Sequence, residues 1–340
     1  MIVRYLIRLT GFLDISDVCG CKGLVEVFDS MLSDTNLPEM LVEPMLSAWM
    51  LASGVSGSST SLRMAVSLAQ QVVAQAEQGV STAPSPRSSL GEDALPGDSD
   101  NDDDDEERLE ENRHRVRTLA SIRALQVVSW SLQQHIGNRD SVQGFEYYDS
   151  IVPFIVESLS QPCPDLRGLS VRCLGLLSLA SQDKCQDFHQ IILQVAKNEI
   201  EESEVRCTAL EALVDMAIVY SERFNNDTAL TQFLLRLQID GAEEGLLRVG
   251  AESSAKLLFS GRLSEPKLFS NLIKFFFLPE LAGSSSQRPD DKDRGDSPEE
   301  VAHLGSTARL QQILSVFFQA FFVAGNGRED IAFGCTSDLV

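Results

Sequence analysis

The sequence has 340 residues, enough for two ordinary domains or for one elongated array of repeats. Hydrophobic residues form 43% of the chain but aromatic residues only 7%, a mixture typical of helices packed on helices. The longest apolar runs, near residues 268–278 and 313–324, are shorter than the ~20 residues that cross a bilayer, which excludes a membrane span.

The net charge of −22 is concentrated in two segments. Residues 81–107 carry ten acids against Arg87 alone, and residues 287–300 carry six acids against three basic residues. Few apolar side chains are available there to offset an ordering cost of ~1 to 2 kcal/mol per residue, so we expect both segments to be disordered inserts. We therefore divide the chain into helical repeats at 1–80, a disordered acidic linker at 81–112, and a repeat domain at 113–340 with a disordered loop at 283–303.

The central block contains a unit that recurs. It reads PDLRGLSVRCLGLLSLA, then SEVRCTALEALVDMAIVY, then EGLLRVGAESSAKLLFSG, with arginines at 167, 206 and 248 and a fourth copy around Arg309. The first three arginines are 39 and 42 residues apart, and the fourth follows 61 residues on, or about 44 if roughly seventeen residues of the expected insert are discounted. A period near 40 is that of HEAT or armadillo helix pairs. An arginine ladder could bind a ligand, but we favour a structural role for Arg167, Arg206 and Arg248, bonding the acidic turns of adjacent repeats.

Each unit divides into two amphipathic helices. In the first unit the apolar stripe from Leu166 to Ala180 is followed, after a polar turn, by a second stripe from Phe188 to Val195. One helix pair cannot bury two such stripes, whereas stacked pairs bury each other's faces. The predicted fold class is therefore all-α: a HEAT-repeat solenoid of antiparallel helix pairs with two disordered acidic inserts.

Several segments resemble one known family. They are RCLGLLSL (172–179), ALEALVDMAIVYS (209–221), LLFSGRLSEPKLFSNLIKFFFLPE (257–280) and RLQQILSVFFQAFF (309–322). Their order is similar to that in the C-terminal region of the CAP-G type condensin subunit. The earlier block GFLDISDVCGCKGLVEVFDSMLSDTNLPEMLVEPMLSAW is similar to the segment that precedes this region.

The resemblance implies a HEAT-repeat scaffold that binds a CAP-H type kleisin subunit. Through the kleisin it would act with an SMC ATPase pair, and together they would hold double-stranded DNA during mitotic chromosome condensation in the nucleus. The chain departs from the family in lacking the long N-terminal half of the solenoid, and in having Leu278-Pro279-Glu280 where an Asn-Pro ending is usual. The DNA and kleisin surfaces that the family carries in that N-terminal half are therefore in doubt for this chain. Met1 is either a true start or the start of a fragment.

Residues for catalysis or metal binding do not gather into any known motif. The four histidines are scattered, and Cys19 and Cys21 have no partner pair or nearby histidine that would complete a zinc site. An odd number of cysteines, seven, lying mostly in apolar patterns indicates a reducing compartment. We expect a protein without catalytic activity, cofactor or metal.

The densest basic group follows the acidic run directly, at Arg113, Arg115 and Arg117, with Arg123 beyond. These arginines are candidate DNA contacts through phosphate neutralisation. The alternative, which we favour, is that they neutralise the neighbouring acids on the same chain. The acidic net charge does not decide between the two, because charges are screened over about 8 Å at physiological salt.

Two phenylalanine stripes are wider than one buried face requires, which makes Phe275, Phe276, Phe318 and Phe322 candidate kleisin contacts. Core packing in the last repeats is the competing and favoured interpretation. Ser85, Ser99 and Ser297 are candidate phosphorylation sites, because they lie in the acidic inserts beside prolines or acids.

A second functional hypothesis remains open. The same repeats would suit a generic HEAT or armadillo adaptor, such as a nuclear transport receptor or a phosphatase scaffold, that binds a different peptide. The identity of the recovered partner separates this hypothesis from a condensin subunit.

Overall fold

The structure is a computed structural model. It describes residues 2–10, 17–34, 37–53, 58–81, 102–137, 149–220, 228–239, 243–277, 298–324 and 331. Within these ranges the regular secondary structure is helical and no strand is present, so the all-α prediction is confirmed. None of the described helices is both long and apolar enough to cross a membrane. The chain divides into two compact units, Met1–Leu176 and Leu177–Val340.

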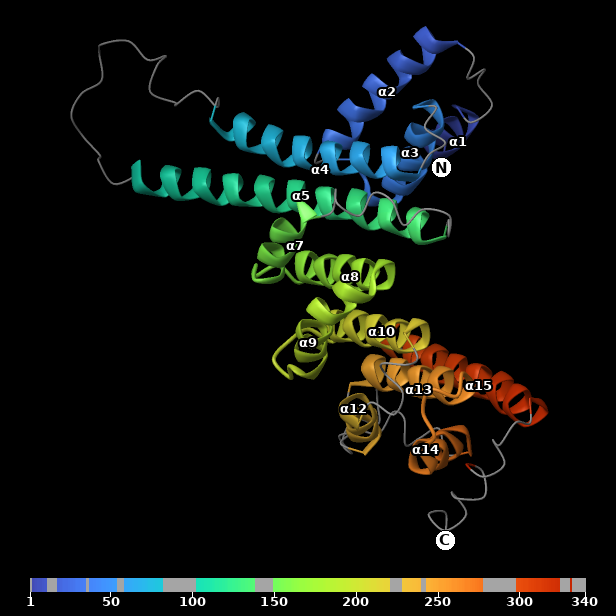
Figure 1. The fold of residues 1–340 in the computed structure, drawn as a ribbon. Coiled ribbons are helices and arrows are strands. Elements are labelled where there is room, and N and C mark those ends of the chain that lie inside the picture. The colour runs from blue at the N-terminus through green and yellow to red at the C-terminus, as the bar shows by residue number, and fades with distance from the viewer. Residues whose placement is uncertain are drawn as a thin grey trace, which may run out of the picture. The chain divides into compact units, whose positions relative to one another are not determined.

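The first unit is built from successive helices of very different length (Figure 1). They are α1 (Ile2–Leu9), α2 (Val18–Ser33), α3 (Glu39–Ala52), α4 (Ser58–Ser81), α5 (Asp102–Gly137), α7 (Val152–Leu159) and most of α8 (Pro164–Ala180). The two longest, α4 and α5, lie side by side, and α2 and α3 pack on each other and on this pair. The core between them contains Leu32, Met45, Leu46, Trp49, Leu68, Val72 and Val127.

A hydrogen bond from a tryptophan side chain joins α3 to α2 in this core. Trp49 of α3 is fully buried, and its Nε1 donates a hydrogen bond of 2.7 Å to Oδ1 of Asp29 in α2. Burial raises the pKa of Asp29 above its usual value, even though the bond from Trp49 acts in the opposite direction. The apolar ring thus fills the core while its one polar atom is satisfied, as a buried tryptophan requires.

The second unit repeats a two-helix design. Its helices are α9 (Gln182–Lys197), α10 (Ser203–Val219), α12 (Thr228–Ile239), α13 (Glu244–Phe259), α14 (Pro266–Phe277) and α15 (Pro298–Val323). Helix α13 packs against α10 on one side and α15 on the other, while α12 and α14 pack on α13 and on each other. The first helices of successive pairs, α8, α10 and α13, begin at Pro164, Ser203 and Glu244, which confirms the period of about 40 residues.

Two helix boundaries differ from the prediction. Helix α5 begins at Asp102, inside the linker expected to be disordered at 81–112, and α15 begins at Pro298, inside the loop expected at 283–303. In the sequence, acids follow directly at both positions, and acids favour the first turn of a helix; Pro298 also suits a first helical position. The predicted disorder at 82–101 and 278–297 lies outside the described residues.

Helix α13 should be the most sensitive element of the second unit, because it contacts α10, α12, α14 and α15. Leu257 in this helix is fully buried, so Leu257→Ala removes packed methyl groups and leaves a cavity. We expect the free energy of unfolding to fall by about 2 to 5 kcal/mol, measured by urea denaturation followed by circular dichroism. Ile200→Ala is the matched control, since Ile200 is 96% exposed and should change stability little. Equal losses in both variants would contradict this account of the core.

Candidate functional site

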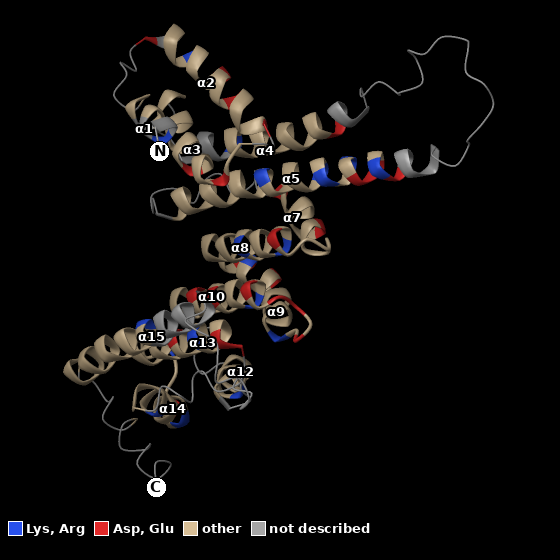
Figure 2. Ribbon diagram, turned by 180° about the vertical axis from the view of Figure 1, so that it is seen from behind, with Lys and Arg blue, Asp and Glu red and all other residues tan. Residues whose placement is uncertain are grey.

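Three of the arginines proposed as DNA contacts, Arg113, Arg115 and Arg117, lie on the N-terminal half of α5, where basic and acidic side chains are interspersed (Figure 2). Arg113 Nη1 lies 3.2 Å from Glu110 Oε2, one helical turn away, in an exposed ion pair. Arg115 and Arg117 are exposed, with Glu107 and Glu111 on the same helix. Part of the positive charge is thus neutralised on α5 itself, which favours the second interpretation for Arg113 and leaves Arg115 and Arg117 facing solvent.

Arg123 does not belong with this group. Only 5% of it is exposed, and its Nη2 donates a hydrogen bond of 2.7 Å to the Leu37 carbonyl oxygen just before α3. Burial lowers the pKa of its guanidinium, while the carboxylates of Asp34 and Glu39 oppose that shift. The prediction that Arg123 contacts DNA is therefore corrected: its side chain is buried within the first unit, where it holds the α3 end against α5.

Other arginines have a similar structural role. Arg167 Nη1 donates to the carbonyl oxygens of Gln161 and Pro162 at 3.0 and 2.6 Å, and Arg206 Nε donates to Ala196 at 3.2 Å. These acceptors lie at or just after the end of the preceding helix, where carbonyls lack helical partners. These bonds agree with the structural role predicted for Arg167 and Arg206, and their acceptors are backbone carbonyls; the predicted bonding to acidic turns stays a prediction. For Arg248 the structural role itself stays a prediction.

The phenylalanines of α14 and α15 divide into an inner and an outer set. The inner set packs around Phe269, whose ring centroid lies 4.9 Å from that of Phe321, and it also contains the buried Phe275 and Phe317. Phe275 is therefore core rather than contact surface, which corrects one of the four kleisin candidates. The outer set, called here the outer aromatic surface, consists of Phe276, Phe277, Phe318 and Phe322.

The outer aromatic surface combines order with exposure. Phe276 packs edge-on against Phe318, with centroids 5.5 Å apart, and against Phe277 at 5.1 Å. Phe277 is nevertheless 70% exposed and Phe322 61% exposed. Large exposed aromatic side chains that are held by their neighbours are typical of a protein-binding site. Three of its four members are kleisin candidates predicted from the sequence, and the fourth, Phe277, continues the same Phe-Phe-Phe run.

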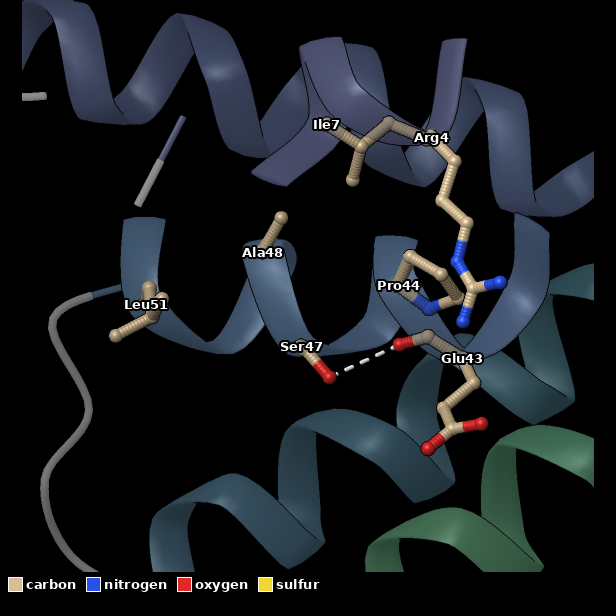
Figure 3. Close-up of a pocket in the computed structure, with 7 residues that line it drawn as sticks. All are labelled: Arg4, Ile7, Glu43, Pro44, Ser47, Ala48 and Leu51. Carbon is tan, nitrogen blue, oxygen red and sulfur yellow. Dashed lines mark hydrogen bonds between the residues drawn. The ribbon is translucent and has the colours of Figure 1, made fainter. Parts of the chain in front are cut away.

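A cavity of about 220 Å³ lies between α1 and α3, where Arg4 reaches toward Pro44 and Glu43 and the Ser47 hydroxyl donates 3.0 Å to the Glu43 carbonyl (Figure 3). Ile7, Ala48 and Leu51 contribute apolar side chains to its lining. Within the described ranges no cluster of histidine, cysteine and acidic side chains could hold a metal ion. Burial raises the pKa of the Cys173 thiol to about 12, so this cysteine is a core residue.

Comparison with known proteins places this arrangement in a family. Residues 123–329 match the model of Cnd3, described as nuclear condensing complex subunits, C-terminal domain. The chain belongs to this family. The match covers the last repeats of the first unit and nearly all of the second, including both α14 and α15.

Individual Cnd3 relatives agree with this assignment. The human "Condensin complex subunit 3" is 30% identical over an alignment that covers 37% of this chain and 16% of that protein. The crystal structure of the S. pombe condensin Cnd3-Cnd2 subcomplex matches with a TM-score of 0.65 at 17% identity, covering 99% of this chain and 39% of that one. At this identity the likeness shows the fold alone, and it confirms the HEAT-repeat architecture. The chain thus spans well under half the length of either relative.

The burial of Arg123 generates a prediction that separates it from its neighbours on α5. Arg123→Met leaves the Leu37 carbonyl without its donor, so we expect the free energy of unfolding to fall by about 1 to 3 kcal/mol. Arg115→Met is the control, because Arg115 is exposed and has no such bond. Thermal unfolding by circular dichroism measures both. Unchanged stability of the Arg123 variant would show that the bond to Leu37 contributes nothing.

Proposed function

We propose that the chain is a non-catalytic HEAT-repeat subunit of condensin. In this proposal it binds the kleisin subunit, acts through the kleisin with an SMC ATPase pair, and helps to hold DNA during mitotic chromosome condensation in the nucleus. The observation that carries the proposal is the Cnd3 match over residues 123–329, a range that contains the outer aromatic surface. ATP hydrolysis would belong to the partner chains.

The outer aromatic surface supports the kleisin part of the proposal. A kleisin segment that lays apolar side chains on Phe276, Phe318 and Phe322 would remove exposed aromatic area from water, at about 25 cal/mol per Å² of apolar surface buried. Phe277, more exposed than any of them, extends the same surface. The inner set around Phe269 fixes these rings from behind, so little side-chain freedom remains to be given up on binding.

The DNA part of the proposal rests on Arg115 and Arg117 of α5. Both are exposed, and neither has an ion-pair partner within the described part of the chain, whereas Arg113 is paired with Glu110. Two guanidinium groups supply only a small share of the phosphate contacts that a stable complex needs. We therefore assign α5 an auxiliary contact, with most of the DNA affinity coming from the assembled complex.

Ser85, Ser99 and Ser297, the proposed phosphorylation sites, lie outside the described residues.

Loss of an exposed ring tests the kleisin assignment. Phe322→Glu places a carboxylate in the outer aromatic surface, so recovery of the kleisin in co-expression and affinity purification should fall by roughly tenfold or more. The control is Ile200→Glu, which adds the same charge at a fully exposed position of the same unit. Circular dichroism verifies that both variants keep their helical content.

Three outcomes would count against the kleisin proposal. Kleisin recovery that is unchanged in the Phe322 variant would remove the aromatic surface from it. An equal loss in the Ile200 variant would do the same. If the unmodified chain instead recovers nuclear transport cargo or a phosphatase catalytic subunit and no kleisin, the adaptor hypothesis replaces the condensin one.

The two exposed arginines give a separate test for DNA. Reversing both charges in Arg115→Glu/Arg117→Glu should weaken duplex binding equally across sequences, and should reduce the salt dependence of the binding constant by about one unit of slope for each arginine that no longer neutralises a phosphate. Fluorescence anisotropy of a labelled duplex, at several salt concentrations, measures this in the complex with kleisin. Lys22→Glu on α2 is the matched control, being exposed in the same unit. An unchanged salt slope in the double variant would assign DNA contact to other residues.

A further inference from the structure

A cavity in the second unit lies away from the outer aromatic surface. It has a volume of about 520 Å³ and opens between α12 and the turn that joins α9 to α10. Helix α12 takes its packing from α13 and α14, which leaves this space beside it. Its polar and aromatic lining residues are Lys197, Glu199, Arg206, Gln232, Phe233 and Arg236.

The charge of this cavity is opposite to that of the protein. Three cationic side chains line it, against the single carboxylate of Glu199, in a chain whose net charge is −22. Lys197 and Arg236 are exposed, and no carboxylate of the described residues lies within ion-pair distance of either. Arg206 uses its Nε for the Ala196 carbonyl, and its two terminal nitrogens have no protein partner within the described ranges. Three cationic residues thus line one hollow together with a single acidic residue, Glu199.

We propose that this cavity binds an acidic peptide segment of a partner protein. Carboxylates of the peptide would meet Lys197, Arg206 and Arg236, where charge-assisted hydrogen bonds are about twice as strong as neutral ones. The Gln232 amide, exposed on α12, adds a neutral donor. Phe233 and Leu237 are buried and contribute apolar side chains to the lining.

The arrangement fits a peptide better than a DNA backbone. DNA presents a charge every ~1.7 Å along its axis and therefore needs a basic stripe, whereas these cations gather around one concave site. Glu199 in the lining, with Glu201 and Glu202 on the same turn, would repel a continuous row of phosphates. A peptide can place separate carboxylates on the cations and leave neutral residues opposite Glu199. The inference goes beyond the proposed function and does not depend on the outer aromatic surface.

Binding of a model acidic peptide to the full chain tests the proposal. Fluorescein-labelled hexaglutamate should bind with an affinity that falls as salt rises, while hexaglutamine of the same length should not bind. Lys197→Glu/Arg236→Glu should weaken hexaglutamate binding by about tenfold, measured by fluorescence anisotropy. Arg206 is left unchanged, because it also holds the Ala196 carbonyl. Lys267→Glu, an exposed lysine of α14 outside the cavity, should change the affinity less than about twofold.

Several results would overturn the assignment. The proposal fails if hexaglutamate binds no more tightly than hexaglutamine. It also fails if the Lys267 variant loses as much affinity for hexaglutamate as the double variant does. A short DNA duplex that binds more tightly than hexaglutamate, and binds the double variant only weakly, would make the cavity a phosphate site instead. If circular dichroism shows that the double variant is destabilised, Gln232→Glu takes its place, with weaker hexaglutamate binding as the expected result. Kleisin recovery is measured separately. The result of the peptide experiment therefore does not decide whether the condensin proposal is correct.

Discussion

The fold depends on apolar helix faces that no single helix pair can bury. Helix α13 shows this most clearly, since its buried residues face α10, α12, α14 and α15, and the removal of any neighbour would return part of that surface to water. At about 25 cal/mol per Å² of apolar area, such burial is of the size of the entropy that ordering a helix costs. Each repeat is therefore stabilised by packing against its neighbours. The packed repeats in turn fix the positions of the side chains on their surfaces.

Packing of apolar faces leaves the helix ends incomplete, and arginine side chains complete them. Carbonyl groups near helix termini have no helical donor, and the guanidinium groups of Arg123, Arg167, Arg206 and Arg262 each reach one or two of them. Tyr220 does the same across 41 residues, donating 2.9 Å to the Leu179 carbonyl. A long side chain with an apolar stem and a polar end can bond such carbonyls, because its stem packs in an apolar interface while its end donates a hydrogen bond.

Some arginines of this chain face solvent and others bond backbone carbonyls. This difference explains part of where the sequence-based predictions succeeded and where they failed. Helix pairs and their period follow from apolar spacing, which the sequence displays directly, and α8, α10 and α13 begin where the copies of the repeated unit begin. Whether an arginine faces solvent or a carbonyl depends on tertiary contacts: Arg123 and Arg115 lie eight positions apart on one helix, yet only the first is buried. The same holds for Phe275 and Phe276, neighbours in sequence of which only Phe275 is buried in the core. Acidic runs misled the boundary prediction because carboxylates at a helix start stabilise the helix.

Net charge is a weak guide to what such a scaffold binds. Screening limits each charge to about 8 Å at physiological salt, so a partner meets the local group of side chains rather than the total of −22. In this chain the local groups differ sharply: α5 mixes signs, the cavity beside α12 is cationic, and the outer aromatic surface is apolar. These groups differ in chemistry, so a partner segment that suits one of them need not suit the others. A solenoid can therefore change one binding surface without altering the packing that supports the others.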